Sequence, residues 1–133
     1  MSQQNVEVVQ RFFDARNQTD IEAMLACLAT EIEFDYSASR GPWAGTYRGH
    51  AAVRRGWETL AEAFDHVRWE ADEFIDAGDA VVVPARFFYR GRGSGVEGVG
   101  RGAQVYWLRD GKIMRFLQCQ DRAQALEAAG PPE

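Results

Sequence analysis

The sequence contains few of the residues on which metal, redox and polyanion-binding sites depend: one lysine, two cysteines and two histidines. Fourteen arginines scattered along the chain supply the remaining cations, and 20 acidic residues outnumber them to give a net charge of −5. An acidic chain without a basic cluster lacks the electrostatic footprint of a nucleic-acid-binding protein. No apolar run approaches the roughly 20 residues that span a bilayer, so we expect no membrane segment.

The scarce cysteines and histidines are also badly spaced for metal chemistry. Cys27 and Cys119 fall in a predicted helix and a predicted strand without CxxC or His/Cys spacing, which favours two reduced, buried thiols. His50 and His66 match no metal-ligand pattern, so we expect neither a metal nor a cofactor. The chain start has no basic stretch followed by an apolar core, which predicts a cytoplasmic protein without a secretory signal.

The sequence that remains predicts a single domain over residues 1–133, because 46% of its residues are hydrophobic and its length suits one core. Helical spacing of apolar residues predicts one helix up to Asn17, a second beginning after the N-cap Asp20, and a third over residues 53–64. A final short helix follows the N-cap Asp121. Residues 37–49 are predicted to form a loop.

Between these helices, alternating and apolar runs bounded by turn residues predict strands over 31–36, 67–76, 80–92, 96–108 and 112–120. Long strands joined by short turns form an antiparallel meander. We therefore expect an α+β fold in which a strongly curved antiparallel sheet wraps around the N-terminal helices on one face and leaves a cavity.

Four motifs resemble the SnoaL-like proteins of the nuclear transport factor two-like superfamily. They are the stretch from Val8 to Asn17, the capped start from Thr19 to Met24, the turn Tyr47-Arg48-Gly49-His50, and the turn from Leu108 to Ile113. The resemblance covers nearly the whole chain and implies a cystatin-like α+β roll with a conical cavity. The superfamily includes polyketide cyclases, ketosteroid isomerase, limonene epoxide hydrolase, scytalone dehydratase and non-catalytic binding modules, so the fold alone does not fix the function.

At the positions where the resemblance implies the superfamily's familiar acids and bases, this chain carries other residues. The general base of ketosteroid isomerase falls at Tyr36, its oxyanion-hole tyrosine at Phe12 and its second donor near Gln104, while the carboxylate of limonene epoxide hydrolase falls at Gln118. Tyr36 is therefore the candidate catalytic residue. The resemblance implies an isomerase, cyclase or hydrolase acting on a small apolar or aromatic metabolite; a non-catalytic ligand-binding protein and a dimeric interaction module are the alternatives.

Strand alternation predicts an aromatic cavity lining with a few hydroxyl and amide groups, the usual composition of small-molecule sites. A packed core is the alternative interpretation of the same pattern. The candidate ligand-binding residues are Phe12, Arg16, Trp43, Trp57, Phe87, Tyr89, Gln104, Tyr106, Phe116 and Gln118.

Arg16 lies one helical turn after Phe12, which predicts that its guanidinium reaches the cavity wall. A cation there needs an anionic partner, which we expect to be Asp35 turned inward by a bulge, another carboxylate, or an acidic ligand. The alternative is that Arg16 extends to solvent.

Three other titratable residues have two interpretations each. Alternation places Asp35 on the solvated face, unless a bulge reverses it. Asp121 is favoured as a helix cap over an acid or base, and His50 as a turn residue over a substrate contact.

The outward positions of the sheet include Phe88, Val105 and Trp107. Such an apolar stripe is unusual on a monomer surface, and relatives commonly pair through this face, so we expect a homodimer that buries it.

Overall fold

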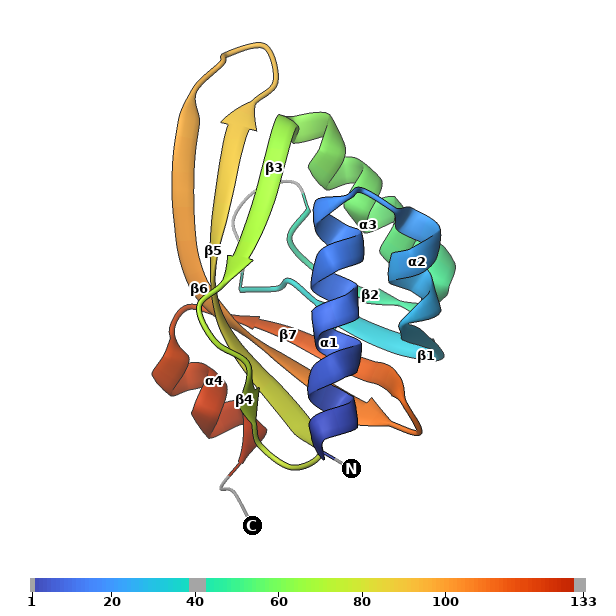
Figure 1. Ribbon diagram of the computed structural model, residues 1–133. Helices are drawn as coiled ribbons and strands as arrows, with labels where there is room; N and C mark the ends of the chain where they lie inside the picture. Colours follow the sequence, from blue (N-terminus) through green and yellow to red (C-terminus); the bar gives the residue numbers. More distant parts are fainter. Residues whose placement is uncertain (1, 39–42, 131–133) are drawn as a thin grey trace.

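The computed structural model describes residues 2–38 and 43–130, which form a seven-stranded sheet and four helices (Figure 1). The helices are α1 (Ser2–Asn17), α2 (Ile21–Ala26), α3 (Gly49–Ala63) and α4 (Arg122–Ala129). Figure 1 shows α1, α2 and α3 together on one side of the curved sheet and α4 on the other. No helix in the described part of the chain combines the length and the apolar composition needed to cross a membrane.

The sheet has the order β2-β1-β7-β6-β5-β3, with β4 paired to β5. Its strands are β1 (Leu28–Asp35), β2 (Thr46–Arg48), β3 (Phe64–Ala71), β4 (Ile75–Asp76), β5 (Ala80–Gly91), β6 (Glu97–Arg109) and β7 (Lys112–Cys119). The pairs β3–β5, β5–β6 and β6–β7 are antiparallel, as the meander predicts. The sheet is nevertheless not wholly antiparallel, because β1 runs parallel to β7.

Two strand predictions need correction. The expected strand over residues 67–76 is two strands, β3 and β4, separated by residues 72–74, of which Asp72 and Glu73 are exposed. The expected loop over 37–49 contains β2, which pairs antiparallel with β1 through Tyr47 and Phe34. Residues 39–42 of that loop and the prolines at 131 and 132 lie outside the described residues.

The predicted helix caps and the last turn are confirmed. Asp20 accepts a hydrogen bond from the backbone N–H of Ala23 at 3.1 Å, and Asp121 accepts one from that of Gln124 at 2.9 Å. Both satisfy amide groups that a helix start leaves free. Asp110 and Gly111, with φ of 52° and 77°, form the two-residue turn that joins β6 to β7.

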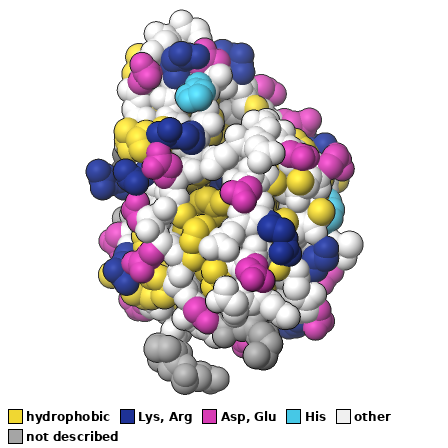
Figure 2. All heavy atoms as spheres, viewed as in Figure 1, with side chains coloured by type: hydrophobic (Ala, Val, Ile, Leu, Met, Phe, Trp, Pro, Cys, Tyr) yellow, Lys and Arg dark blue, Asp and Glu magenta, His cyan; other side chains and the backbone are white. Residues whose placement is uncertain are grey.

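An aromatic core fills the space between the helices and the inner face of the sheet. The rings of Phe34 on β1 and Phe116 on β7 stack with centroids 4.0 Å apart, and Phe12 on α1 packs against Phe34 and Tyr106. Figure 2 shows hydrophobic side chains also gathered in the middle of the face that carries α1 and β3, with charged side chains around them.

The outer face of the sheet differs from the predicted apolar stripe because α4 covers part of it. Val105 is fully buried there, in a second apolar cluster that includes Ala125 of α4, so it is not an exposed surface residue. Phe88 and Trp107 are half-buried. The guanidinium of Arg68 lies 4.5 Å from the ring centroid of Phe88, and that of Arg115 lies 4.6 Å from that of Trp107.

Candidate functional site

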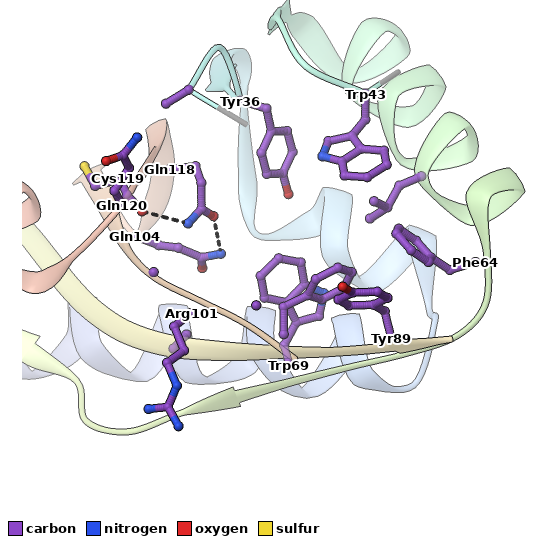
Figure 3. Close-up of a pocket in the computed structure, with 16 residues that line it drawn as sticks. Tyr36, Trp43, Phe64, Trp69, Tyr89, Arg101, Gln104, Gln118, Cys119 and Gln120 are labelled. Atoms are coloured by element: carbon purple, nitrogen blue, oxygen red, sulfur yellow. Dashed lines mark hydrogen bonds between the residues drawn. The ribbon is translucent and has the colours of Figure 1, made fainter. Parts of the chain in front are cut away.

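A pocket of about 520 Å³ opens on the inner face of the sheet, beside the start of the loop after β1 (Figure 3). We call it the sheet pocket. Its lining residues are Tyr36, Ala38, Trp43, Leu60, Phe64, Trp69, Ala85, Phe87, Tyr89, Gly100, Arg101, Gly102, Gln104, Gln118, Cys119 and Gln120. The lining includes six aromatic side chains, and none of these lining residues is an aspartate, glutamate or histidine.

Glycines on β6 leave space for the sheet pocket. Gly100 and Gly102 alternate along the strand and pair with Phe87 and Ala85 of β5. A Cβ on Gly100 would make ordinary contacts with Phe87, at 3.8 Å or more, so this lining position can hold a larger side chain. A Cβ on Gly102 would lie 2.7 Å from the Gln118 side-chain nitrogen and 2.8 Å from the Cys119 carbonyl oxygen, so Gly102 is needed for close approach to β7.

Arg16 anchors a buried polar network beneath the pocket. Its guanidinium donates hydrogen bonds to the hydroxyl of Tyr36 at 2.8 Å, to the Gln104 side-chain oxygen at 3.2 Å and to the hydroxyl of Tyr106 at 3.4 Å. Tyr106 also donates to Gln104, whose amide nitrogen donates to Gln118 at 2.9 Å (Figure 3). Gln118 in turn donates to the Cys119 carbonyl at 3.1 Å. The network links α1 to β6, to β7 and to Tyr36, the residue that follows β1.

Tyr36 presents a protonated hydroxyl to the sheet pocket. Burial raises the pKa of Tyr36, and the nearby Arg16 guanidinium opposes this without reversing it. Because Arg16 donates to the Tyr36 oxygen, and no acceptor among the described residues takes the phenolic proton, Tyr36 is free to donate to a ligand. Burial likewise raises the pKa of Tyr106.

A second, smaller pocket of about 260 Å³ lies between the C-terminal end of α1, α3 and β3. We call it the helix pocket. Its lining residues are Arg16, Thr19, Ile21, Met24, Tyr36, Trp57, Leu60, Ala61, Phe64, Asp65, His66, Val67, Trp69 and Arg92. Tyr36, Leu60, Phe64 and Trp69 line both pockets, so the two are neighbours that share a wall.

The structure distributes the candidate ligand-binding residues over three environments. Six of the sequence candidates, counting Tyr36, line the sheet pocket: Tyr36, Trp43, Phe87, Tyr89, Gln104 and Gln118. Arg16 and Trp57 line the helix pocket. Phe12, Tyr106 and Phe116 line neither pocket and are fully buried in the aromatic core, so any effect they have on a ligand is exerted through the residues that they support.

The other titratable candidates lie away from the sheet pocket. Asp35 is half-buried and accepts a hydrogen bond from the Ser37 backbone N–H at 2.8 Å. Burial raises the pKa of Asp35, but hydrogen bonds from Ser37 and Thr46 and the positive charge of Arg115 outweigh it, so the pKa is lowered. A His50 ring nitrogen lies 3.1 Å from the Leu28 carbonyl oxygen. Asp121 caps α4. Within residues 2–38 and 43–130, no three metal-ligating side chains gather.

Trp69 is the main pocket residue that sequence reasoning missed. It is buried on β3, lines both pockets and pairs with Phe87 of β5. Strand alternation over Val67, Trp69 and Ala71 was the available signal. Phe64 and Leu60, at and near the junction of α3 with β3, were recognised as part of an apolar helical stripe but not as pocket residues.

A family model described as a SnoaL-like domain matches residues 9–116. The chain belongs to the SnoaL-like family. This match agrees with the resemblance carried by the helix and turn motifs, and it includes most of the residues that line the two pockets. The curated proteins contain no sequence relative that matches this chain.

Solved structures share the fold of this SnoaL-like chain. A nuclear transport factor two-like protein from Burkholderia thailandensis is 33% identical, with a TM-score of 0.79 over 90% of this chain and 95% of that one. TerC, co-crystallised with polyporic acid, is 23% identical, with a TM-score of 0.80 over 95% and 98%. RV0760c from Mycobacterium tuberculosis, in complex with estradiol-17beta-hemisuccinate, is 17% identical, with a TM-score of 0.72 over 84% and 88%.

Proposed function

We propose that this SnoaL-like protein binds a small, largely apolar or aromatic metabolite in the sheet pocket. The observation that carries the proposal is the Tyr36 hydroxyl, which is held by Arg16 in an aromatic pocket and retains a proton to donate. Aromatic walls with a few fixed polar groups suit such ligands. The ligands of TerC and RV0760c, polyporic acid and estradiol-17beta-hemisuccinate, support a site for small molecules in this fold.

The residues around the pocket favour binding and polarisation over proton abstraction. No carboxylate or imidazole is among the described residues that line the sheet pocket, so a conventional general base is missing from its wall. If the protein is an isomerase, cyclase or hydrolase, Tyr36 donates a hydrogen bond to the oxygen on which negative charge develops, with Arg16 stabilising that charge through the phenol. A non-catalytic binding protein is the second candidate, and the same absence of a base favours it.

Calorimetric titration with 2-naphthamide, a neutral aromatic probe, tests binding. Gly100→Leu places a larger side chain at a lining position of the sheet pocket and should abolish heat of binding, while circular dichroism remains native. Ala123→Leu adds bulk at an exposed position of α4, outside the pocket lining, and it should bind as the wild type does. Equal binding by Gly100→Leu and the wild type, or failure of the wild type to bind both 2-naphthamide and the corresponding acid, 2-naphthoate, would overturn the proposal.

We also propose a homodimer that uses the outer sheet face. Phe88 and Trp107 are the partly accessible aromatic residues of that face, and Val99 of β6 is 52% exposed. Val105 has no part in this contact because α4 buries it. Two-fold symmetry would bring the same residues of both copies together.

A further inference from the structure

Arg16 is a buried cation without a carboxylate partner. Its side chain reaches the core from α1, and the residue is 8% exposed. Eight ion pairs join other arginines to acidic residues on the surface, whereas Arg16 pairs with no carboxylate of residues 2–38 and 43–130. A buried charge is costly unless an opposite charge compensates it.

The groups that surround Arg16 are neutral. Its hydrogen-bond acceptors are two phenols and one amide, and its guanidinium carbon lies 3.8 Å from the ring centroid of Trp69. Burial keeps both phenols protonated at neutral pH, so neither supplies a negative charge. These contacts orient the guanidinium and leave its charge unneutralised.

The helix pocket, which Arg16 lines, also has an unpaired buried donor in its wall. Trp57 is only 6% exposed, and its buried indole nitrogen has no hydrogen-bond partner among the described residues. Such an unpaired buried donor is rare in folded proteins. Trp57 and Arg16 both line the helix pocket, so one small space is bordered by the buried cation and by the residue that carries the unpaired donor.

The remaining charged residues of the helix pocket do not supply the anion. Asp65 lies at its rim, where its carboxylate is held by Arg90 at 2.7 Å. Arg92, also on the rim, donates to the carbonyl oxygens of Ala61 and Phe64 and adds a further positive charge.

We infer that the ligand of this protein is an organic acid, with its aromatic body in the sheet pocket and its carboxylate or acidic enol against Arg16 and Trp57. This inference rests on the proposed binding function and specifies the class of ligand. The two pockets are adjacent, because Tyr36, Leu60, Phe64 and Trp69 line both, and the inferred ligand lies across this boundary. The anion neutralises the buried guanidinium and accepts the indole proton.

Calorimetric titration with the matched pair 2-naphthoate and 2-naphthamide at about pH 7.5 tests the inference, because the pair differs in charge but hardly in shape. Naphthoate should bind about tenfold or more tightly than naphthamide. Arg16→Met should remove this preference. Trp57→Phe, which keeps an aromatic ring, should weaken naphthoate binding about threefold or more.

Two arginine controls separate a local effect from general electrostatics. Arg11→Met removes an exposed charge from the same helix, and Arg109→Met removes an exposed charge at the end of β6, outside the lining of both pockets. Both should retain the preference for naphthoate. If either abolishes it as Arg16→Met does, the preference comes from the surface field and the inference is wrong.

The rise in the unfolding midpoint on adding each probe gives a second measurement. Saturating 2-naphthoate should raise the midpoint of the wild type more than 2-naphthamide does, and Arg16→Met should remove this difference, whereas an arginine with a structural role alone would leave it unchanged. Equal affinity for naphthoate and naphthamide would overturn this inference and leave the binding function standing. Absence of binding by both probes would overturn both.

Discussion

The guanidinium of Arg16 lies over the indole of Trp69, with its central carbon 3.8 Å from the ring centroid. Trp is the strongest partner for such a cation–π contact, and desolvation strengthens it. The next residue of α1, Asn17, holds the backbone of the same tryptophan: its side chain donates to the Trp69 carbonyl and accepts from the Trp69 N–H, both at 2.8 Å. Two consecutive residues of one helix thus fix the ring and the main chain of the wall shared by both pockets.

Asn17→Ala should therefore loosen β3 where it meets the pockets. It removes two hydrogen bonds and leaves the Trp69 amide and carbonyl without these partners, so we expect a loss of about 1–3 kcal/mol in the free energy of unfolding, measured in urea. Asn5→Ala is the control, because Asn5 makes one long, exposed hydrogen bond to Gly78 at 3.4 Å. Equal stability of the two variants would show that the Asn17 contacts do not hold Trp69.

Much of the fold is predictable because its signals are local. Helical spacing, the caps Asp20 and Asp121, and the Asp110-Gly111 turn each depend on a few neighbouring residues. The parallel pairing of β1 with β7 joins distant segments, and no local pattern encodes it. The position of α4 is also hidden, because its only buried residue is Ala125.

The site is predictable to the extent that strand alternation determines it. Alternation correctly places Tyr36, Gln104 and Gln118 on one wall, and helical spacing brings Arg16 to the same region. The sequence does not reveal that Arg16 meets phenols instead of a carboxylate, because that depends on the angle between α1 and the sheet. The sequence also does not reveal that the Trp57 indole nitrogen lacks a hydrogen-bond partner, because the residues packed around it come from other elements.

The two pocket glycines of β6 should respond differently to a methyl group. Gly102→Ala forces its Cβ toward the backbone oxygen of Cys119, so it should destabilise the protein by about 1–3 kcal/mol. Gly100→Ala meets ordinary contacts at 3.8 Å or more and should be close to neutral. Urea denaturation of both variants tests the difference, and equal losses would contradict the close packing of β6 on β7 at Gly102.

The proposed dimer should depend on Trp107. Trp107→Glu places a charge on the outer face beside Arg115, and light scattering should then give the mass of one 14.9 kDa chain instead of two. Val96→Glu is the control, because Val96 is 64% exposed just before β6 begins, at the β5–β6 connection. A monomeric wild type, or a Trp107→Glu variant that remains dimeric, would rule out this contact.

The buried phenols of Tyr36 and Tyr106 should make the protein sensitive to alkali. Burial raises the pKa of both above the ordinary value of about 10, so the folded state retains protons that the unfolded chain releases. Their contribution to the free energy of unfolding is fully present below about pH 10 and is lost as the pH rises through the folded-state pKa, by up to about 1.4 kcal/mol per pH unit for each phenol.

Urea unfolding at about pH 8 and about pH 11 measures this loss of stability in the wild type. Tyr36→Phe and Tyr106→Phe should each show a smaller difference between the two pH values than the wild type shows, because each has one fewer phenol to ionise in the unfolded chain. If both variants lose as much stability as the wild type between these pH values, the alkaline sensitivity arises from groups other than these two tyrosines.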